Sequence, residues 1–504
     1  MLRYLHFDQV IELPSAKADL TVLDHLRERR NQVGTKEGCA SGDCGACTVV
    51  VAERVIDQSG QEILAYKSVN SCIMFAGSLH GKQLITVENL RGCDALHPAQ
   101  QAMVDCHGSQ CGFCTPGFVM SIFALVKTVS SDREGVQAYS ISGESNRPLI
   151  DEHLGGNLCR CTGYKPIIKA AEQSLLHAGE ADKFSRTEAS TLATLAKLAA
   201  PEKPEADKSV GFYRPQTISE LCELRAAYPA AALLAGGTDL ALSVTQQLES
   251  LDQIIQLGGI DELDFFDVSA EAIRFGAGLS LSSLRQKITA YCPELTDLLI
   301  RYGGTQVRNQ ATVGGNFANA SPVGDMPPVL IALNASVVLQ SVRGKRKLMA
   351  EEFFHSYKKT AMQADEFVCE FSIPLASFNP AANSIIVNRF YKVSKRLEDD
   401  ISSVCAAFHL VLDGETITHA SCAFGGMAEI PKRAVALENA ICGKPLNKAC
   451  LDSAFVALKQ DFQPIDDVRA SADYRNRVCE NLLVRLATEI YTPNVATQVT
   501  SHAS

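Results

Sequence analysis

The clearest candidates for a chemical role in this sequence are cysteines in a loop of small residues, which could bind a metal centre. Residues 38–49 read GCASGDCGACTV, with C-x4-C-x2-C spacing, and a fourth cysteine follows later; the four are Cys39, Cys44, Cys47 and Cys72. This spacing is typical of plant-type [2Fe–2S] sites, in which four thiolates hold the cluster. Small residues let backbone N–H groups approach the cluster sulfurs. A zinc site is the alternative, but the x4 gap fits zinc knuckles poorly.

Four further cysteines form two closer pairs. GSQCGFCTPG contains Cys111 and Cys114, and GNLCRCTGY contains Cys159 and Cys161. We expect each pair just ahead of a helix N-terminus, where free N–H groups and the positive end of the helix dipole favour thiolate charge. A C-x-C pair also fits a zinc knuckle poorly. These four thiols therefore predict a second [2Fe–2S] cluster.

Two glycine pairs follow later in the chain. One turn is ALLAGGTDL at 232–240, and the other is ATVGGN at 311–316, followed by ASPVGD at 320–325. Paired glycines let main-chain N–H groups close around a pyrophosphate, to which Thr and Asn side chains add hydrogen bonds. Neither turn is a G-x-G-x-x-G, so the dinucleotide fingerprint is absent. Each alone is more typical of a simple tight turn, but both in one domain beside iron–sulfur sites indicate a flavin site.

Strands and one helix must position the first cysteine loop. Thr21 to Asp24 has the pattern of a capping box that opens a helix at 23–30. β-Branched runs predict strands within 2–13, 48–54, 63–66 and 84–87. We therefore expect a ferredoxin-like β-grasp domain over residues 1–90.

The second cysteine set lies among helical patterns. We expect helices at 97–104, at 118–127, and from the GNLCRCTGY motif to about residue 177, which make a helical-bundle [2Fe–2S] domain of residues 91–178. Residues 179–210 are polar and rich in Ala, Glu and Lys, with two prolines. That composition predicts an interdomain linker, partly helical at most.

The rest of the chain predicts two more domains and a short tail. The two glycine turns fall in residues 211–382, the expected FAD-binding domain. Residues 383–495 contain three strand patterns followed by two helical ones, which indicates an α+β C-terminal domain. Residues 496–504 are small and polar and are expected to fray. The predicted fold class is thus α+β and multidomain.

Bulk composition limits the functions to consider. The chain has 504 residues, 46% hydrophobic and 21% charged, as in ordinary globular proteins. Its net charge is −10, without a basic block, which argues against nucleic-acid binding. No apolar run approaches the roughly 18 residues of a membrane span, so no membrane association is expected. Eighteen cysteines in such a chain are more often metal ligands than disulfides, which indicates a cytoplasmic protein.

Taken together, these motifs show a resemblance. The chain resembles the small, iron–sulfur and FAD subunits of bacterial xanthine dehydrogenases, in the molybdenum hydroxylase family. The resemblance runs from about residue 2 to 490 and rests on GCASGDCGACTV, GSQCGFCTPG, GNLCRCTGY, LLAGGTDL, ATVGGN, ASPVGD and YKVSKRLEDDI. It implies two [2Fe–2S] clusters, and FAD in a domain of the vanillyl-alcohol-oxidase type.

The resemblance also assigns flavin contacts by position. The first turn would cradle FAD, the second would bind its phosphates, Tyr302 would stand beside the flavin, and Asp325 and Lys392 would add polar contacts. The residues of the two turns are Leu233, Leu234, Ala235, Gly236, Gly237, Thr238, Asp239 and Leu240, and Thr312, Val313, Gly314, Gly315 and Asn316.

Three positions depart from the pattern of the family's animal enzymes. Asp239 replaces a glutamate, Arg301-Tyr302 replaces an aromatic neighbourhood, and Leu397 stands where those enzymes keep an arginine linked to switching between NAD+ and oxygen. We therefore expect a dedicated dehydrogenase. The charged loop 392–400 has two interpretations: such runs are mostly solvated surface, but this one could shape a nicotinamide pocket.

The function implied is that of an electron-transfer subunit. A molybdenum–molybdopterin centre on a separate large subunit would oxidise hypoxanthine and xanthine to urate, and this chain would pass the electrons through both clusters and FAD to NAD+. The helical-domain cluster would come first. We expect a dimer of heterodimers and no acid, base or nucleophile in this chain. The alternatives are a subunit of another molybdenum hydroxylase for aldehydes, nicotinate or other N-heterocycles, a free-standing iron–sulfur flavoprotein, and a zinc-stabilised interaction module.

Overall fold

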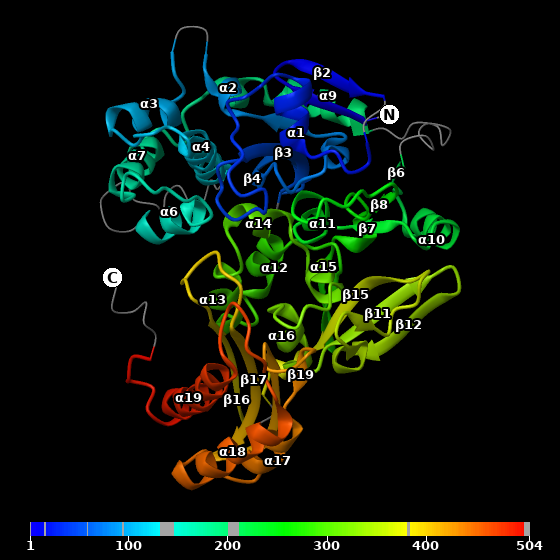
Figure 1. The fold of residues 1–504 in the computed structure, drawn as a ribbon, viewed down its shortest axis with the longest axis vertical. Helices are drawn as coiled ribbons and strands as arrows, with labels where there is room; N and C mark the ends of the chain where they lie inside the picture. Colours follow the sequence, from blue (N-terminus) through cyan, green and yellow to red (C-terminus); the bar gives the residue numbers. More distant parts are fainter. Residues whose placement is uncertain are drawn as a thin grey trace. The chain divides into compact units, whose positions relative to one another are not determined.

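The chain, drawn in Figure 1, folds as two compact units. The computed structural model describes residues 2–14, 17–57, 59–92, 95–131, 146–199, 211–380 and 384–497. The first unit holds residues 1–214, 230–258 and 303–311, and the second holds 215–229, 259–302 and 312–504. The expected tail falls almost wholly outside the described residues.

A five-stranded sheet forms the N-terminal part of the first unit. Its order is β2-β1-β5-β3-β4, in which only the β1–β5 pair is parallel. The strands are β1 (Leu2–His6), β2 (Gln9–Leu13), β3 (Thr48–Ile56), β4 (Glu62–Asn70) and β5 (Gln83–Ile85). Thr21 caps α1 (Val22–Asp24), as predicted, because its Oγ1 accepts the Asp24 N–H at 3.0 Å. The helix continues as a π-helical turn, His25–Arg29, and its buried face packs on the apolar strand residues.

Helices surround the second cysteine set. After the short α2 (Val87–Leu90), they are α3 (Pro98–Asp105), α4 (Thr115–Ser131), α6 (Arg147–Leu154) and α7 (Lys165–Leu175), which lie together in Figure 1. Phe118, Ile122 and Phe123 of α4 are fully buried in their common core. Proline stands in the first turn of α3, α6 and α7, where its missing N–H costs nothing.

The described part of the predicted linker contains two helices. The first part of residues 179–210 forms α8 (Lys183–Arg186) and α9 (Glu188–Ala199). Leu195 and Leu198 of α9 pack in a buried cluster with Leu5 and Leu64 of the sheet. Residues 200–210 lie outside the described part of the chain. An Ala- and Glu-rich composition is common to linkers and to amphipathic helices. Here the apolar contacts of Leu195 and Leu198 stabilise the helix.

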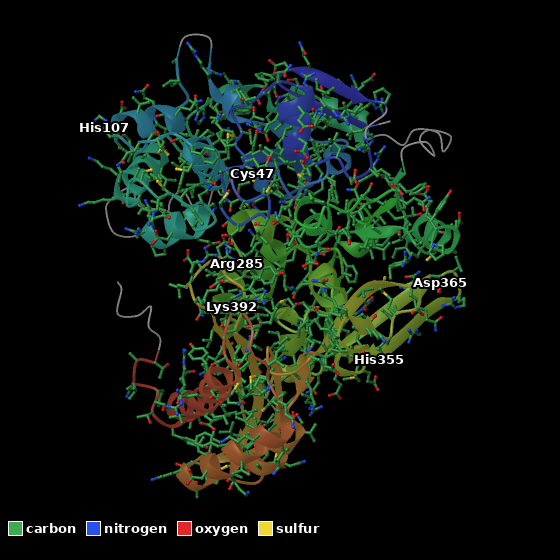
Figure 2. The ribbon with its side chains drawn as sticks, viewed as in Figure 1. Cys47, His107, Arg285, His355, Asp365 and Lys392 are labelled. Carbon is green, nitrogen blue, oxygen red and sulfur yellow. The ribbon has the colours of Figure 1, made fainter. Side chains whose placement is uncertain are left out.

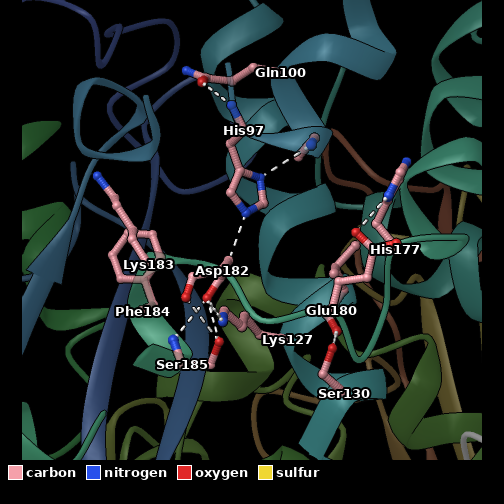
Figure 3. A network of polar contacts seen from close by, with 12 residues as sticks. His97, Gln100, Lys127, Ser130, His177, Glu180, Asp182, Lys183, Phe184 and Ser185 are labelled. Carbon is pink, nitrogen blue, oxygen red and sulfur yellow. Dashed lines mark hydrogen bonds and ion pairs between the residues drawn. The ribbon is translucent and has the colours of Figure 1, made fainter. Parts of the chain in front are cut away.

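A buried ion pair anchors the start of α8 (Figure 3). The Asp182 carboxylate accepts hydrogen bonds from Lys127 Nζ at 2.7 Å and from the Ser185 backbone N–H at 2.8 Å. His97 Nε2 lies 3.4 Å away. Burial alone would raise the pKa of Asp182, but hydrogen bonds from His97 and Lys127 outweigh it and hold the pKa well below its usual range. Asp182 therefore ties α8 to α3 and α4.

Part of the flavin-domain sequence belongs to the first unit. It forms a parallel sheet of order β6-β8-β7. Two short helices belong to the same unit. The elements are β6 (Phe212–Tyr213), β7 (Ala232–Leu234), β8 (Ile254–Gln256), α11 (Leu240–Thr245) and α14 (Thr305–Gln310). Phe212, Leu234 and Ile254 are buried with Ile73 and Phe75, next to the first cysteine set.

The second unit contains the remainder of the flavin-domain sequence. Its sheet is antiparallel, of order β12-β11-β15-β10-β9. The strands are β9 (Phe266–Val268), β10 (Ala272–Gly276), β11 (Ser336–Ser341), β12 (Gly344–Met349) and β15 (Phe367–Pro374), with a small hairpin β13 (Phe354–Ser356) and β14 (Lys359–Thr360). The helices are α10 (Ile218–Ala227), α12 (Leu281–Ile288), α13 (Glu294–Ile300), α15 (Val313–Ala318) and α16 (Met326–Ala332).

An α+β domain completes the second unit. Strands β16 (Ile385–Val393), β17 (Val404–Asp413), β18 (Thr416–Gly425) and β19 (Lys432–Arg433) pair in sequence order as an antiparallel sheet. Helices α17 (Val435–Ile441), α18 (Lys448–Asp461) and α19 (Ala472–Tyr491) contribute to one apolar core with it. No helix in the described parts of the chain combines the length and the apolarity that crossing a bilayer requires.

Candidate functional site

The cysteines of the first set lie near one another. Cys47 and Cys72 are buried and their Sγ atoms lie 3.3 Å apart; Cys47 is labelled in Figure 2. Cys39 and Cys44 are half-buried in the loop before β3. Cys39 Sγ accepts the backbone N–H groups of Ser41 at 3.4 Å, Asp43 at 3.3 Å and Cys44 at 3.3 Å. Such N–H groups stabilise thiolate charge, which iron ligation requires.

Side-chain and backbone contacts favour a charged sulfur at Cys39. A hydrogen bond from the Cys44 thiol is the largest effect, and it lowers the pKa of Cys39 far below its usual value. The close approach of the Cys44 thiol explains why residue 38 is a glycine. A Cβ at Gly38 would lie 2.6 Å from Cys44 Sγ, so any larger residue there would displace the thiol. The loop sequence is therefore suited to hold sulfur ligands.

The second cysteine set lies at two helix starts, as predicted. Helix α4 begins directly after Cys114, and α7 begins shortly after Cys161. Cys111 and Cys161 are exposed, whereas Cys159 is buried. Burial raises the pKa of Cys159, but hydrogen bonds from Thr162, whose Oγ1 lies 3.1 Å from Cys159 Sγ, outweigh it, so the pKa is lowered.

Both sets consist of close pairs. Among the described residues, no group of three or more His, Cys, Asp or Glu side chains is arranged to hold a metal ion. The eight cysteines instead contact one another in pairs, Cys39 with Cys44, Cys47 with Cys72, Cys111 with Cys161, and Cys114 with Cys159, and Cys39 also contacts Cys72. A [2Fe–2S] cluster shares four thiolates between two irons. Pairs of thiols on each side fit that donor set.

The two cysteine loops touch each other through their backbones. The Leu158 N–H donates to Cys44 O at 3.0 Å, and Asn157 Nδ2 donates to Gly45 O at 3.0 Å. Glycine makes this approach possible, since a Cβ at Gly45 would lie 2.2 Å from Gly156 O. Gly45 also has φ +66°, a conformation that favours glycine. The first unit thus holds the two cysteine loops in direct contact.

The first glycine turn lies beside the first cysteine set in the same unit. It connects β7 to α11, and Asp239 stands at the N-terminal end of α11. A Cβ at Gly236 would lie 1.9 Å from Gln310 O, so α14 packs directly on the turn. A Cβ at Gly237 would lie 3.4 Å from the carbonyl oxygen of Ile73, the neighbour of Cys72.

The second glycine turn is in the second unit, at the start of α15. Thr312 Oγ1 caps that helix by accepting the Gly315 N–H at 3.0 Å. A Cβ at Gly314 would lie 2.6 Å from the Ala277 Cβ, so the glycine allows α15 to pack closely on the loop that follows β10. Asn316 Nδ2 donates to the Tyr302 hydroxyl at 2.8 Å, which brings two predicted flavin contacts together.

The remaining predicted flavin contacts form a buried ion pair in the second unit. Lys392 Nζ, at the end of β16 (Figure 2), lies 2.6 Å from Asp325 Oδ2 and 5.8 Å from the centre of the Tyr302 ring. Both side chains are almost fully buried. Ser402 Oγ donates to the other Asp325 oxygen at 2.5 Å. Nothing in the sequence pattern identified Ser402, which is 77 positions away from Asp325.

Arg301 holds the loop that follows Lys392. Its guanidinium donates to Lys392 O at 2.6 Å, Leu397 O at 2.9 Å and Ser394 Oγ at 3.3 Å. Burial lowers the pKa of Arg301. The solvated-surface interpretation of loop 392–400 fits residues 395–397, which are exposed, but not Lys392 and Asp399, which are buried. The departure at Arg301 is thus a structural contact to the loop.

Four family models match this chain. They are the 2Fe-2S iron-sulfur cluster binding domain at residues 7–77, the [2Fe-2S] binding domain at 86–172, the FAD binding domain in molybdopterin dehydrogenase at 208–376, and the CO dehydrogenase flavoprotein C-terminal domain at 389–490. The α+β multidomain fold class is confirmed, with ferredoxin-like, helical, FAD-binding and C-terminal domains.

Known proteins similar to this chain include longer enzymes. The xanthine dehydrogenase of Emericella nidulans is 32% identical over 91% of this chain and 36% of its own length. The xanthine dehydrogenase/oxidase of Rattus norvegicus is 29% identical over 92% of this chain and 37% of its own length. The chain therefore spans just over a third of the curated relatives it matches.

A solved structure is similar to about half of the chain. It is a carbon monoxide dehydrogenase from Hydrogenophaga pseudoflava, 26% identical, with a TM-score of 0.51 over 54% of this chain and 94% of that chain.

The family models show the order of the domains in this sequence: two [2Fe–2S]-binding domains, an FAD-binding domain and a flavoprotein C-terminal domain. That combination fits the iron–sulfur and FAD part of a molybdenum hydroxylase, an oxidoreductase family to which xanthine dehydrogenases belong.

Proposed function

We propose that this chain is the electron-transfer subunit of a xanthine dehydrogenase, of the small-subunit type found in bacteria. It would carry to NAD+ the electrons released when a molybdopterin-binding large subunit oxidises hypoxanthine and xanthine to urate. The observation that carries this proposal is the arrangement in the first unit. There the ligand loops of both cysteine sets touch, and the first glycine turn lies beside the neighbour of Cys72.

The chain's own residues would hold the cofactors. Cys39, Cys44, Cys47 and Cys72 would bind one cluster, and Cys111, Cys114, Cys159 and Cys161 the other. We propose as FAD contacts residues 233–240 and, in the second unit, residues 312–316 with Tyr302, Asp325 and Lys392. When bound, the clusters supply single-electron transfer, and the flavin supplies the conversion to the electron pair that NAD+ accepts.

The residues themselves supply electrostatics and orientation. Backbone N–H groups at Cys39 and helix N-termini behind Cys114 and Cys161 stabilise thiolate charge without any moving group. The Lys392–Asp325 pair is shielded from water and fixed by Ser402, so its charges keep one orientation beside Tyr302. We assign no acid, base or nucleophile to this chain.

An apolar surface supports the proposed large-subunit partner. Phe113 is 49% exposed, and Leu158 and Tyr164 are each 37% exposed, in the two loops that carry the exposed Cys111 and Cys161. Exposed aromatic and aliphatic side chains next to a redox site are suited to a partner that must come close. We propose that the molybdopterin-binding subunit docks there, in a dimer of heterodimers.

We also propose a cytoplasmic location, because the free thiols at every described cysteine suit a reducing compartment.

A second candidate is the same role in another molybdenum hydroxylase. The similarity to a carbon monoxide dehydrogenase and the match to the CO dehydrogenase flavoprotein C-terminal domain favour it. Substrate contacts would lie on the partner, so the two candidates differ only in what the assembled enzyme oxidises.

Co-purification and a substrate screen test the proposal. The chain is produced with the large subunit, and NADH formation is followed with hypoxanthine, xanthine, an aldehyde, nicotinate and carbon monoxide. We expect NADH with the two purines and molybdenum in the purified complex. Turnover of another substrate alone would favour the second candidate. Zinc in place of iron would refute both, and so would a colourless chain.

A further inference from the structure

One short helix of the flavin-domain sequence reaches between the two cysteine loops of the first unit. Gln306, on α14, is fully buried. Its Nε2 lies 2.8 Å from Asn157 Oδ1, 3.0 Å from Ser121 Oγ and 3.3 Å from Thr48 Oγ1. These partners come from the second cysteine loop, from α4 and from the start of β3. We call the four residues the polar junction.

The polar junction lies between ligands of the two predicted clusters. Thr48 directly follows Cys47, and Asn157 precedes Cys159 by one intervening residue. Asn157 also donates through Nδ2 to Gly45 O at 3.0 Å and to Thr48 Oγ1 at 3.2 Å, while Ser121 Oγ donates to Asn157 Oδ1 at 2.6 Å. The hydrogen bonds of the polar junction therefore connect the two cysteine loops to each other and to Gln306.

Gln306 fits this place tightly and at some cost. Its Oε1 is buried and accepts no hydrogen bond within the described residues. A Cβ at Gly156 would lie 2.1 Å from that oxygen, so the second loop closes directly on the side chain. Burying an amide oxygen without a donor costs free energy, which an apolar side chain of equal length would avoid. The amide is therefore better explained by the geometry it enforces than by stability.

We propose that Gln306 is a positioning residue for electron exchange between the two clusters, an inference that rests on the proposed function. Its amide holds Asn157 and Thr48, and through them it keeps the Leu158 N–H on Cys44 O. Electron exchange weakens steeply with separation, so small displacements of the two loops matter. Since α14 also packs against Gly236, the same helix fixes both loops relative to the first glycine turn.

The test replaces the amide without changing the side chain's length. Gln306→Met is compared with Gln310→Met, because Gln310 lies on the same helix and, within the described residues, its side chain donates a single hydrogen bond, to Gln306 O at 3.4 Å. The chemically reduced, cluster-loaded chain is examined by electron paramagnetic resonance, and hydrogen exchange is measured at Leu158. We expect Q306M to keep its iron and both cluster signals but to lose spin–spin splitting between them. Leu158 should exchange faster, and Q310M should match the wild type.

The outcomes separate this inference from the proposed function. Wild-type protein without two [2Fe–2S] signals would overturn both. Two signals, with the splitting and the Leu158 exchange unchanged in Q306M, would overturn the inference alone. Should Q306M fail to accumulate, Ser121→Ala removes a hydroxyl that bonds both Gln306 and Asn157, and it must weaken the splitting in the same direction. An unchanged splitting in S121A would also overturn the inference.

Discussion

At the scale of single residues, buried charge is the most demanding feature of this chain. Lys392 and Asp325 are 3% and 4% exposed and depend on each other and on Ser402 for every strong polar contact that the structure shows at their charged atoms. A buried ion pair adds little net stability compared with apolar residues, but removing one partner leaves an uncompensated charge. The pair therefore acts as a fixed electrostatic feature beside Tyr302.

Breaking this pair from one side should be costly. We expect Lys392→Met to lower the free energy of unfolding by about 3 kcal/mol, because the buried Asp325 carboxylate would then have no counter-charge. The double variant Lys392→Met/Asp325→Leu should recover most of that loss, and the exposed control Lys395→Met should change it by less than about 0.5 kcal/mol. Urea unfolding measures all three. Equal losses in the single and double variants would refute the explanation.

Buried histidine should make the first unit sensitive to mild acid. Burial, helped by the positive charges of Arg30 and Arg29, lowers the pKa of His25 to about 4. The unfolded chain binds the proton with a pKa of about 6.5. The stabilisation is thus complete above about pH 6.5 and is lost as the pH falls towards 4, by at most about 3 kcal/mol. His25→Gln should flatten this dependence in urea unfolding at several pH values, whereas the exposed His355→Gln should not. A slope that is unchanged in H25Q would contradict this assignment.

At the scale of elements, the sequence was informative where structure is local. The Thr21 cap depends only on neighbouring residues, and it is found where it was expected. The composition of residues 179–210 did not reveal the packing of helix α9, because α9 contacts Leu5 and Leu64, which are far away in the sequence. Gln306 could not be identified for the same reason, since its partners are 149 to 258 positions away.

The anchoring of α8 by Asp182 gives a test at this scale. Asp182→Asn removes the charge that compensates the buried Lys127, and we expect a loss of about 2 kcal/mol in unfolding free energy, with faster hydrogen exchange over α8 and α9. Asp151→Asn is the matched control, because its pair with Arg147 is solvent-exposed and should contribute less than about 0.5 kcal/mol. Unchanged exchange in α8 would show that the apolar contacts of α9 alone hold the segment.

At the scale of the whole molecule, the proposed cluster loops and the proposed partner surface lie in the same short segments. The loops that hold Cys111 and Cys161 also present Phe113 and Tyr164 to solvent. A cluster ligand in an exposed loop is open to oxidation and to loss of metal. A subunit that covers these loops would protect the cluster and bring its own redox centre close. The family resemblance led us to propose a partner, and the exposed apolar residues suggest where such a partner would dock.

Phe113 tests that location. Phe113→Asp places a charge where an aromatic contact is proposed, and we expect at least about a tenfold weaker association with the molybdenum-containing subunit. Iron content should stay unchanged, because the Phe113 side chain is not a ligand. Ile56→Asp is the control, since Ile56 is 67% exposed on β3 of the same unit and lies away from these loops in sequence. Co-purification and sedimentation measure the association. If I56D weakens the complex as much as F113D, the effect is general surface charge; if F113D binds normally, the partner docks elsewhere.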